Sequence, residues 1–286
     1  MVEIERHKTY PNASRRALRR LAEDVEEGVA KVERYPDALN LQLLAGLALL
    51  GHRTVVDPAG AERETWLALR AALDAGAAVF TVAAADRGAL VPVRMGGRAV
   101  TTSGTGPVYY STAENWLTTL WLAVVARDRE VLERLTAFPP DLLRASGSEP
   151  GYLYDTVRAF QLFFRREDGV GPALGAALAG SKPEALTDDD EREVADLLRF
   201  PQLTLFHYVL KDDAATEFND ALAEALRAHE AYWSKTEERR ASPIGYLALG
   251  PLALATIAQD AGIAITVTSD YLPPALLDGT ARIENG

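Results

Sequence analysis

The chain has 286 residues, of which 48% are hydrophobic and 25% charged, as in an ordinary soluble globular protein. Asp and Glu number 41 against 30 Lys and Arg, for a formal net charge of -11. Such a negative field repels a phosphate backbone, so we expect no direct binding of nucleic acid. The lack of cysteine excludes disulfides, thiolate catalysis and thiolate metal sites.

The N-terminal residues contain no targeting signal. Residues 1–16 mix acidic and basic side chains and lack an apolar core segment, so we expect a cytoplasmic protein. The longest apolar run, Leu41 to Leu50, is shorter than the roughly 20 residues that a membrane helix needs. We therefore expect a buried core helix there and no contact with a membrane.

The spacing of apolar residues in the first third of the chain predicts three helices. They cover about residues 12–34, 37–56 and 62–82. Asn12 or Ser14 is a candidate N-cap for the first of these helices, and Asp37 is a candidate for the second.

A small β element interrupts this helical pattern. Val91, Val93 and Val100 flank Gly96 and Gly97, which predicts a hairpin over residues 90–102 with a Gly-Gly turn. Near the C-terminus, residues 263–268 (IAITVT) alternate in a way that is typical of a short strand. That strand is a candidate to extend the hairpin.

The rest of the chain is predicted to be mostly helical. The expected helices cover about residues 112–126, 130–138, 151–166, 212–233 and 245–261. Ser111 or Thr112 is the N-cap candidate of the first, and Arg127 and Asp128 are expected to hold the turn that follows it. Residues 167–190, rich in Gly, Ala and Pro, are the candidate flexible segment. The fold class is mainly α, with packed helix pairs compatible with a solenoid, in one domain spanning residues 1–286.

Sequence motifs for catalysis and cofactors are absent. The four His are not spaced as a metal site requires. Residues 175–182 resemble a phosphate-binding loop, but with Ser and Lys in the wrong order and no strand before them. No GxSxG nucleophile motif occurs. We therefore assign no metal, no cofactor and no catalytic residue, and we expect binding rather than catalysis.

Several motifs in fixed order nevertheless resemble one protein family. The most extensive is Ala113 to Asp128 (AENWLTTLWLAVVARD). The others are Leu142 to Gly147, the helix around Tyr152, Glu217 to Asn219, His229 to Trp233, Leu247 to Pro251, Asp260 to Gly262 and Ser269 to Pro273. Together they resemble the immunity-49 family of bacterial polymorphic-toxin immunity proteins, which are common in actinomycetes.

This resemblance implies a mostly helical cytoplasmic protein. It also implies that the chain binds a cognate toxin, often a nuclease in such toxin and immunity systems, and blocks it. The family offers no catalytic residues to carry over to this sequence.

Two sets of residues are candidates for a functional site. An acidic surface would steer onto a toxin with a basic surface. Its candidate residues are Asp188, Asp189, Asp190, Glu191, Glu237 and Glu238. Alternatively, an enzyme or a small-molecule-binding accessory protein of specialised metabolism would use a pocket between helices. The candidate lining residues of that pocket are Trp116, Trp121, Tyr154, His207, Tyr208, His229 and Trp233. A helical scaffold for regulatory partners is a third reading, and the sequence leaves the oligomeric state open.

Overall fold

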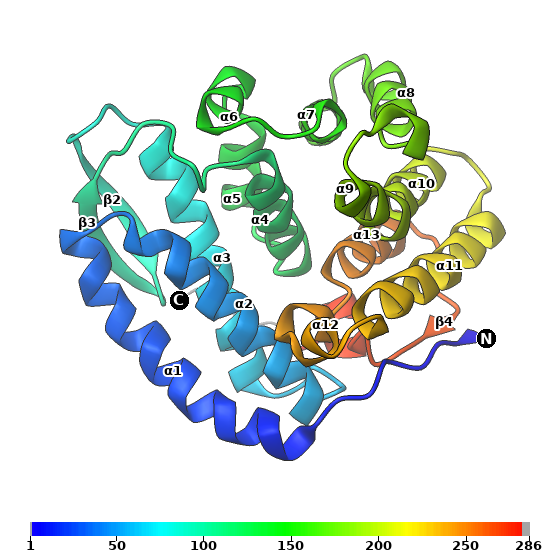
Figure 1. Ribbon diagram of the computed structural model, residues 1–286, viewed down its shortest axis with the longest axis horizontal. Coiled ribbons are helices and arrows are strands. Elements are labelled where there is room, and N and C mark those ends of the chain that lie inside the picture. Colours follow the sequence, from blue (N-terminus) through cyan, green and yellow to red (C-terminus); the bar gives the residue numbers. More distant parts are fainter. Residues whose placement is uncertain (1, 282–286) are drawn as a thin grey trace.

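The computed structural model describes residues 2–281 and confirms the mainly α fold (Figure 1). Three helices in succession form the N-terminal part. They are α1 (Pro11–Arg34), α2 (Ala38–Val56) and α3 (Arg63–Ala83). Helix α2 packs against both α1 and α3. The predicted helix pairs are therefore present from the start of the chain.

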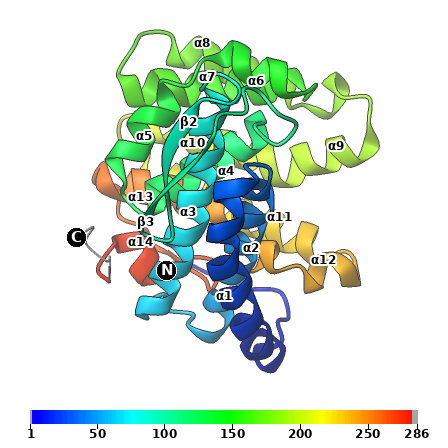
Figure 2. The same cartoon turned by 90° about the vertical axis from the view of Figure 1, so that its left-hand side faces the viewer.

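The predicted hairpin is confirmed. Strands β2 (Leu90–Met95) and β3 (Arg98–Ser103) are antiparallel, with Val93 opposite Val100. The turn residues Gly96 and Gly97 have φ angles of +57° and +78°, which only glycine adopts without strain in a two-residue hairpin turn. Figure 2 shows the hairpin beside α3, and β3 also contacts α1.

The remaining helices continue around the molecule (Figure 1). The middle elements are α4 (Ala113–Val125), α5 (Arg129–Thr136), α6 (Pro140–Ser146), α7 (Gly151–Arg165), α8 (Val170–Gly180) and η1 (Pro183–Ala185). The C-terminal elements are α9 (Asp189–Val194), η2 (Ala195–Arg199), α10 (Phe200–Val209), α11 (Ala215–Ser234), α12 (Glu237–Ala241), η3 (Pro243–Tyr246), α13 (Leu249–Asp260) and α14 (Pro274–Asp278).

Of the predicted N-caps, Thr112 is right, Asp37 is right in position but not in its side-chain contact, and Asn12 or Ser14 is wrong. The Thr112 hydroxyl accepts the Asn115 amide and caps α4 as expected. Helix α1 instead begins at Pro11, and Ser14 is buried and hydrogen-bonded to His52 Nδ1 at 3.0 Å. Asp37 occupies the N-cap position of α2, but its carboxylate accepts the Tyr110 hydroxyl at 3.0 Å instead of a backbone amide of the helix. Tertiary contacts have taken over both side chains.

The stretch expected to be flexible contains an unpredicted helix. Within residues 167–190, α8 buries Ala173, Leu174 and Ala177 and packs against α7. Small residues on the inner face allow this close packing, while the Gly and Pro content hides the helical pattern. The mobility of the segment stays a prediction.

Of the two residues expected to hold the turn after α4, Asp128 does so, whereas the Arg127 side chain donates to Asp260 at 3.1 Å and to the Leu277 carbonyl at 2.8 Å. Asp128 caps α5 by accepting the Val131 amide at 3.1 Å. Its carboxylate also accepts hydrogen bonds from Arg70 and Arg94. Arg94, on β2, donates as well to the buried Asp74 of α3 at 2.9 Å. The four side chains form one network that fastens the hairpin to α3 and α5.

The predicted C-terminal strand does not join the hairpin. Strand β4 (Val267–Thr268) pairs in parallel with β1 (Val2–Glu3) at the N-terminus. The Asn219 side chain hydrogen-bonds the backbone just before β4. It donates to the Ala264 carbonyl and accepts the Thr266 amide. The idea of a three-stranded sheet is therefore wrong, and the N-terminal segment closes the helical array instead.

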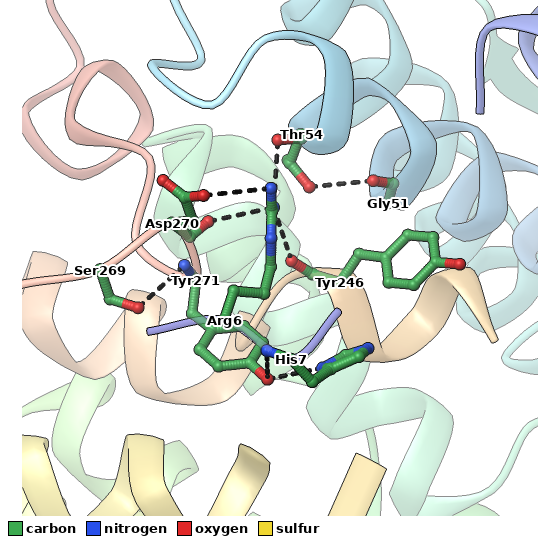
Figure 3. A network of polar contacts seen from close by, with 8 residues as sticks. All are labelled: Arg6, His7, Gly51, Thr54, Tyr246, Ser269, Asp270 and Tyr271. Atoms are coloured by element: carbon green, nitrogen blue, oxygen red, sulfur yellow. Dashed lines mark hydrogen bonds and ion pairs between the residues drawn. The ribbon is translucent and has the colours of Figure 1, made fainter. Parts of the chain in front are cut away.

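Arg6 fixes this N-terminal segment (Figure 3). Its guanidinium donates to the carbonyls of Thr54, Tyr246 and Asp270 at 3.1 to 3.3 Å, and its side chain is only 5% exposed. Burial lowers the pKa of Arg6 below its ordinary value. Three parts of the chain that are distant in sequence thus meet at one side chain.

Two helices resemble membrane spans in length and composition alone. They are α2 and α3, and 50% and 72% of their apolar windows lie buried inside the protein. Core helices of this kind pass the same test.

Candidate functional site

A cleft of about 310 Å³ lies between the N-terminal and C-terminal helices. We call it the central cleft. Its walls come from α2, α4, α9, η2, α10, α11, η3 and α13. Figure 1 shows α2, α4, α9, α11 and α13 around the middle of the molecule. The large apolar residues that line it are Leu47, Leu50, Trp121, Val194, Leu198, Trp233, Ile244, Leu247 and Leu249.

The structure brings three of the seven candidate pocket residues together. Trp121, His229 and Trp233 line the central cleft. The other four, Trp116, Tyr154, His207 and Tyr208, do not line it. Trp116 is fully buried and donates to the Leu135 carbonyl at 3.0 Å. Trp116 and Trp121 lie five residues apart on α4, which separates them by about 140° around the helix.

Two glycines shape the cleft. A Cβ atom on Gly245 would lie 2.4 Å from the Trp233 ring, so the ring can pack there only against glycine. A Cβ atom on Gly51 would lie 1.9 Å from the Pro243 carbonyl oxygen, so glycine also permits the close contact of α2 with η3. These positions set the distance between two walls.

His229 lines the central cleft and is a neutral side chain. Its Nε2 donates to the Gly245 carbonyl at 3.0 Å, and burial lowers its pKa to about 4. Its ring packs edge-on against the Tyr271 ring, with the two ring centroids 4.7 Å apart. The Tyr271 hydroxyl in turn lies 2.6 Å from His7 Nδ1 and accepts the His7 amide. No sequence motif signalled this link between the cleft and the N-terminal segment.

Acid should destabilise the protein through these histidines. The pKa of His229 falls from about 6.5 in the unfolded chain to about 4 in the fold, so the unfolded state binds more protons between those values. The contribution of neutral His229 to the free energy of unfolding is fully present above about pH 6.5 and should fall by about 3 kcal/mol between that pH and pH 4. Burial also lowers the pKa of His7 and His52, which adds in the same direction. Urea denaturation at a series of pH values measures the effect.

A matched pair of variants isolates His229. The His229→Gln variant keeps an amide donor for the Gly245 carbonyl but does not titrate, so its stability should depend less on pH over that range. Gln202→Asn, at a residue that lines the same cleft and does not titrate, should keep the wild-type slope. Equal slopes in all three proteins would show that His229 does not cause the acid sensitivity.

Acidic residues of α9 and α12 lie beside the central cleft. We call them the acidic rim, and they are Asp188, Asp189, Asp190, Glu191, Glu193, Glu237 and Glu238. Glu193 on α9 accepts Lys235 at 2.6 Å and Arg239 at 3.1 Å, and these contacts lower the pKa of Glu193. They hold α9 against the end of α11 and α12. The two candidate acidic segments, Asp188 to Glu191 and Glu237 to Glu238, are thereby brought to neighbouring helices. Of these residues, Glu191 also lines the cleft.

A second cavity opens on the other side of Glu191. It measures about 600 Å³, and we call it the acidic depression. Its charged lining residues are Asp155, Asp188 and Glu191, and none of its lining residues is Lys or Arg. The Tyr152 hydroxyl donates to Glu191, and burial together with this carboxylate raises the pKa of Tyr152. The sequence does not indicate Asp155 as a site residue, because it is a single acidic residue in helix α7, whose apolar spacing predicts a core helix.

A third cavity, of about 500 Å³, lies between α1, α3 and the hairpin. We call it the hairpin groove. Val25, Val29, Leu67 and Met95 contribute apolar walls, and Arg53 lies among the polar lining residues. Helix α2 also lines the groove through Leu49 and Arg53, and no sequence motif indicates a site whose walls come from separate helices and a hairpin.

Within residues 2–281, no three His, Asp or Glu side chains are grouped so that they could hold a metal ion. The sequence profile of the family Immunity protein 49 matches residues 57–276, and the chain belongs to this family. No curated protein and no solved structure matches the chain significantly.

Proposed function

We propose that this protein binds a cognate bacterial toxin in the cytoplasm and neutralises it by forming a stoichiometric complex. The observation that carries the proposal is the family match over residues 57–276. The net charge of -11 and the acidic rim support it, because they would attract a protein with a basic surface.

The charge also favours one class of toxin. Proteins that act on nucleic acids present basic surfaces to the phosphate backbone. An acidic inhibitor complements such a surface, so a nuclease is the toxin that we propose. Blocking would follow if the acidic rim covered the toxin's substrate-binding face.

Growth rescue tests the proposal. This chain is co-expressed in a sensitive host with the product of the adjacent gene, and the mixture is then examined by size-exclusion chromatography. We expect restored growth and a stable one-to-one complex. Continued toxicity and separate elution of the two proteins would contradict the proposal.

The hairpin groove supports a second candidate function, binding of a small molecule. Its volume of about 500 Å³ falls in the range of about 300 to 1,000 Å³ that is usual for ligand sites. A thermal-shift screen with apolar metabolites tests this alternative. A stabilising compound whose effect disappears in Leu67→Asp would support it, while a screen without any stabilising compound would count against it.

A further inference from the structure

Beyond the family's general role, the central cleft and the acidic depression are neighbours with complementary chemistry. Glu191 lines both the acidic depression and the central cleft, whose large side chains are mostly apolar although Glu114, Arg199 and Gln202 also line it. Helix α9 carries Glu191, and the Glu193 contacts with Lys235 and Arg239 hold this helix in place. The two cavities are thus parts of one continuous surface with a fixed arrangement.

The apolar part of this surface extends beyond the cleft. Ile244, at the cleft, is 39% exposed. Leu41 and Leu44 precede Leu47 on α2 at a spacing of three residues and are 67% and 50% exposed. Exposed apolar side chains that continue into a concavity are typical of protein interfaces. A cavity of about 310 Å³ is at the small end of the range for ligand sites, which suits a single large side chain.

The acidic part has charges left to pair. Glu191 accepts a neutral tyrosine hydroxyl, and Asp188 accepts the Glu191 amide, so neither hydrogen bond brings in a cation. Asp155 has no Lys or Arg beside it among the lining residues of the depression. In contrast, Glu114 at the cleft is already paired with Arg199. Arg192 lies beside the depression, where it donates to the carbonyls of Leu186 and Thr187, but its ion pair is with Asp189. Among the described residues, Asp155, Asp188 and Glu191 form no ion pair, so their negative charge would attract a lysine or arginine from outside.

We propose that the two cavities form one docking surface, and that its occupant is a segment of the cognate toxin in which a large apolar side chain stands next to a lysine or arginine. The apolar side chain enters the central cleft, and the cation enters the acidic depression. This inference rests on the proposed function and specifies its interface. Buried apolar anchors beside complementary charges are the contacts that dominate protein interfaces.

Two variants test the two halves separately. The probe is the product of the adjacent gene in a catalytically inactive form, and isothermal titration calorimetry measures its dissociation constant. Ile244→Asp should raise Kd about 100-fold, because it places a charge in the apolar part. Asp155→Asn should raise Kd about 10-fold at about 50 mM NaCl and by less at about 300 mM, where salt screens the lost attraction.

Matched controls establish the specificity of these effects. Leu210 is also 39% exposed but lines none of the three cavities described above, so Leu210→Asp should leave Kd within about 2-fold. Asp168→Asn, on the loop between α7 and α8, is the control for Asp155→Asn. Circular dichroism melting curves verify that all four variants are folded.

The outcomes separate this inference from the proposed function. Weaker binding in both Ile244→Asp and Asp155→Asn, with both controls unchanged, supports the docking surface. If the wild type binds but either test variant keeps its affinity, the two-part surface is wrong while the proposed function stands. A loss of binding in Leu67→Asp alone would assign the toxin to the hairpin groove and also overturn the inference. If the wild type does not bind, the proposed function fails, and the docking surface fails with it.

Discussion

Replacing Asp128 with alanine should lower the free energy of unfolding by about 3 to 5 kcal/mol, because it removes the carboxylate that pairs with the largely buried Arg70, one of the two carboxylates that pair with Arg94, and a helix cap. The Asp128 side chain is 4% exposed and bonds to both Arg70 and Arg94. Burial alone would raise its pKa, but the hydrogen bonds from Arg70 and the Val131 amide hold the pKa below its ordinary value. The carboxylate is therefore charged at neutral pH. Urea denaturation monitored by circular dichroism measures the loss.

A second cap separates the two causes of this effect. Asp188 caps α9 through the Glu191 amide in the same way, but at an exposed position. Asp188→Ala should therefore cost only about 1 kcal/mol, the usual value of a cap. Equal losses in the two variants would mean that the network of Asp74, Arg94, Asp128 and Arg70 contributes nothing beyond the cap.

Gly51→Ala should be the most damaging small substitution near the cleft. Its new methyl group would lie 1.9 Å from the Pro243 carbonyl oxygen, which belongs to the backbone and cannot rotate away. Helix α2 and η3 must then separate, and we expect a loss of about 3 kcal/mol, at the upper end of overpacking effects. Because both elements line the central cleft, toxin affinity should fall as well.

Gly175→Ala is the matched control for Gly51→Ala. Gly175 lies within helix α8, and nothing is within 4 Å of the position of its added Cβ. Alanine favours the helix over glycine by about 0.5 to 1 kcal/mol, so this variant should be slightly more stable than the wild type. Thermal melting of the two variants gives the comparison. A loss of similar size in both would show that the contact with Pro243 is not the cause.

The helices and the hairpin were predictable because their signals are local. Apolar periodicity marks α1, α3 and α7, and two adjacent glycines mark the turn between β2 and β3. The pairing of β4 with β1 was not predictable, since it joins residues more than 260 positions apart in the chain. Likewise, the capping residues Ser14 and Asp37 were diverted by tertiary contacts to His52 and Tyr110.

The candidate site was predictable only in part. Aromatic and histidine residues suggested a pocket, and Trp121, His229 and Trp233 do line one. Residue type alone could not separate them from Trp116, because the distinction from Trp121 depends on which side of the buried helix α4 faces the central cleft. The position of Glu191 between an apolar and an acidic cavity depends on the packing of α7 and α9, which no sequence motif encodes.

A titration of toxin activity with this protein tests most directly whether it neutralises the toxin by forming a stoichiometric complex. The product of the adjacent gene is held at a fixed concentration well above Kd, and its activity is followed as the protein is added. If the protein neutralises the toxin by stoichiometric binding, toxin activity falls linearly, reaches zero at equal molar amounts and does not change with incubation time. Progressive loss of toxin activity at a small fraction of one equivalent would contradict it, because that behaviour belongs to an enzyme.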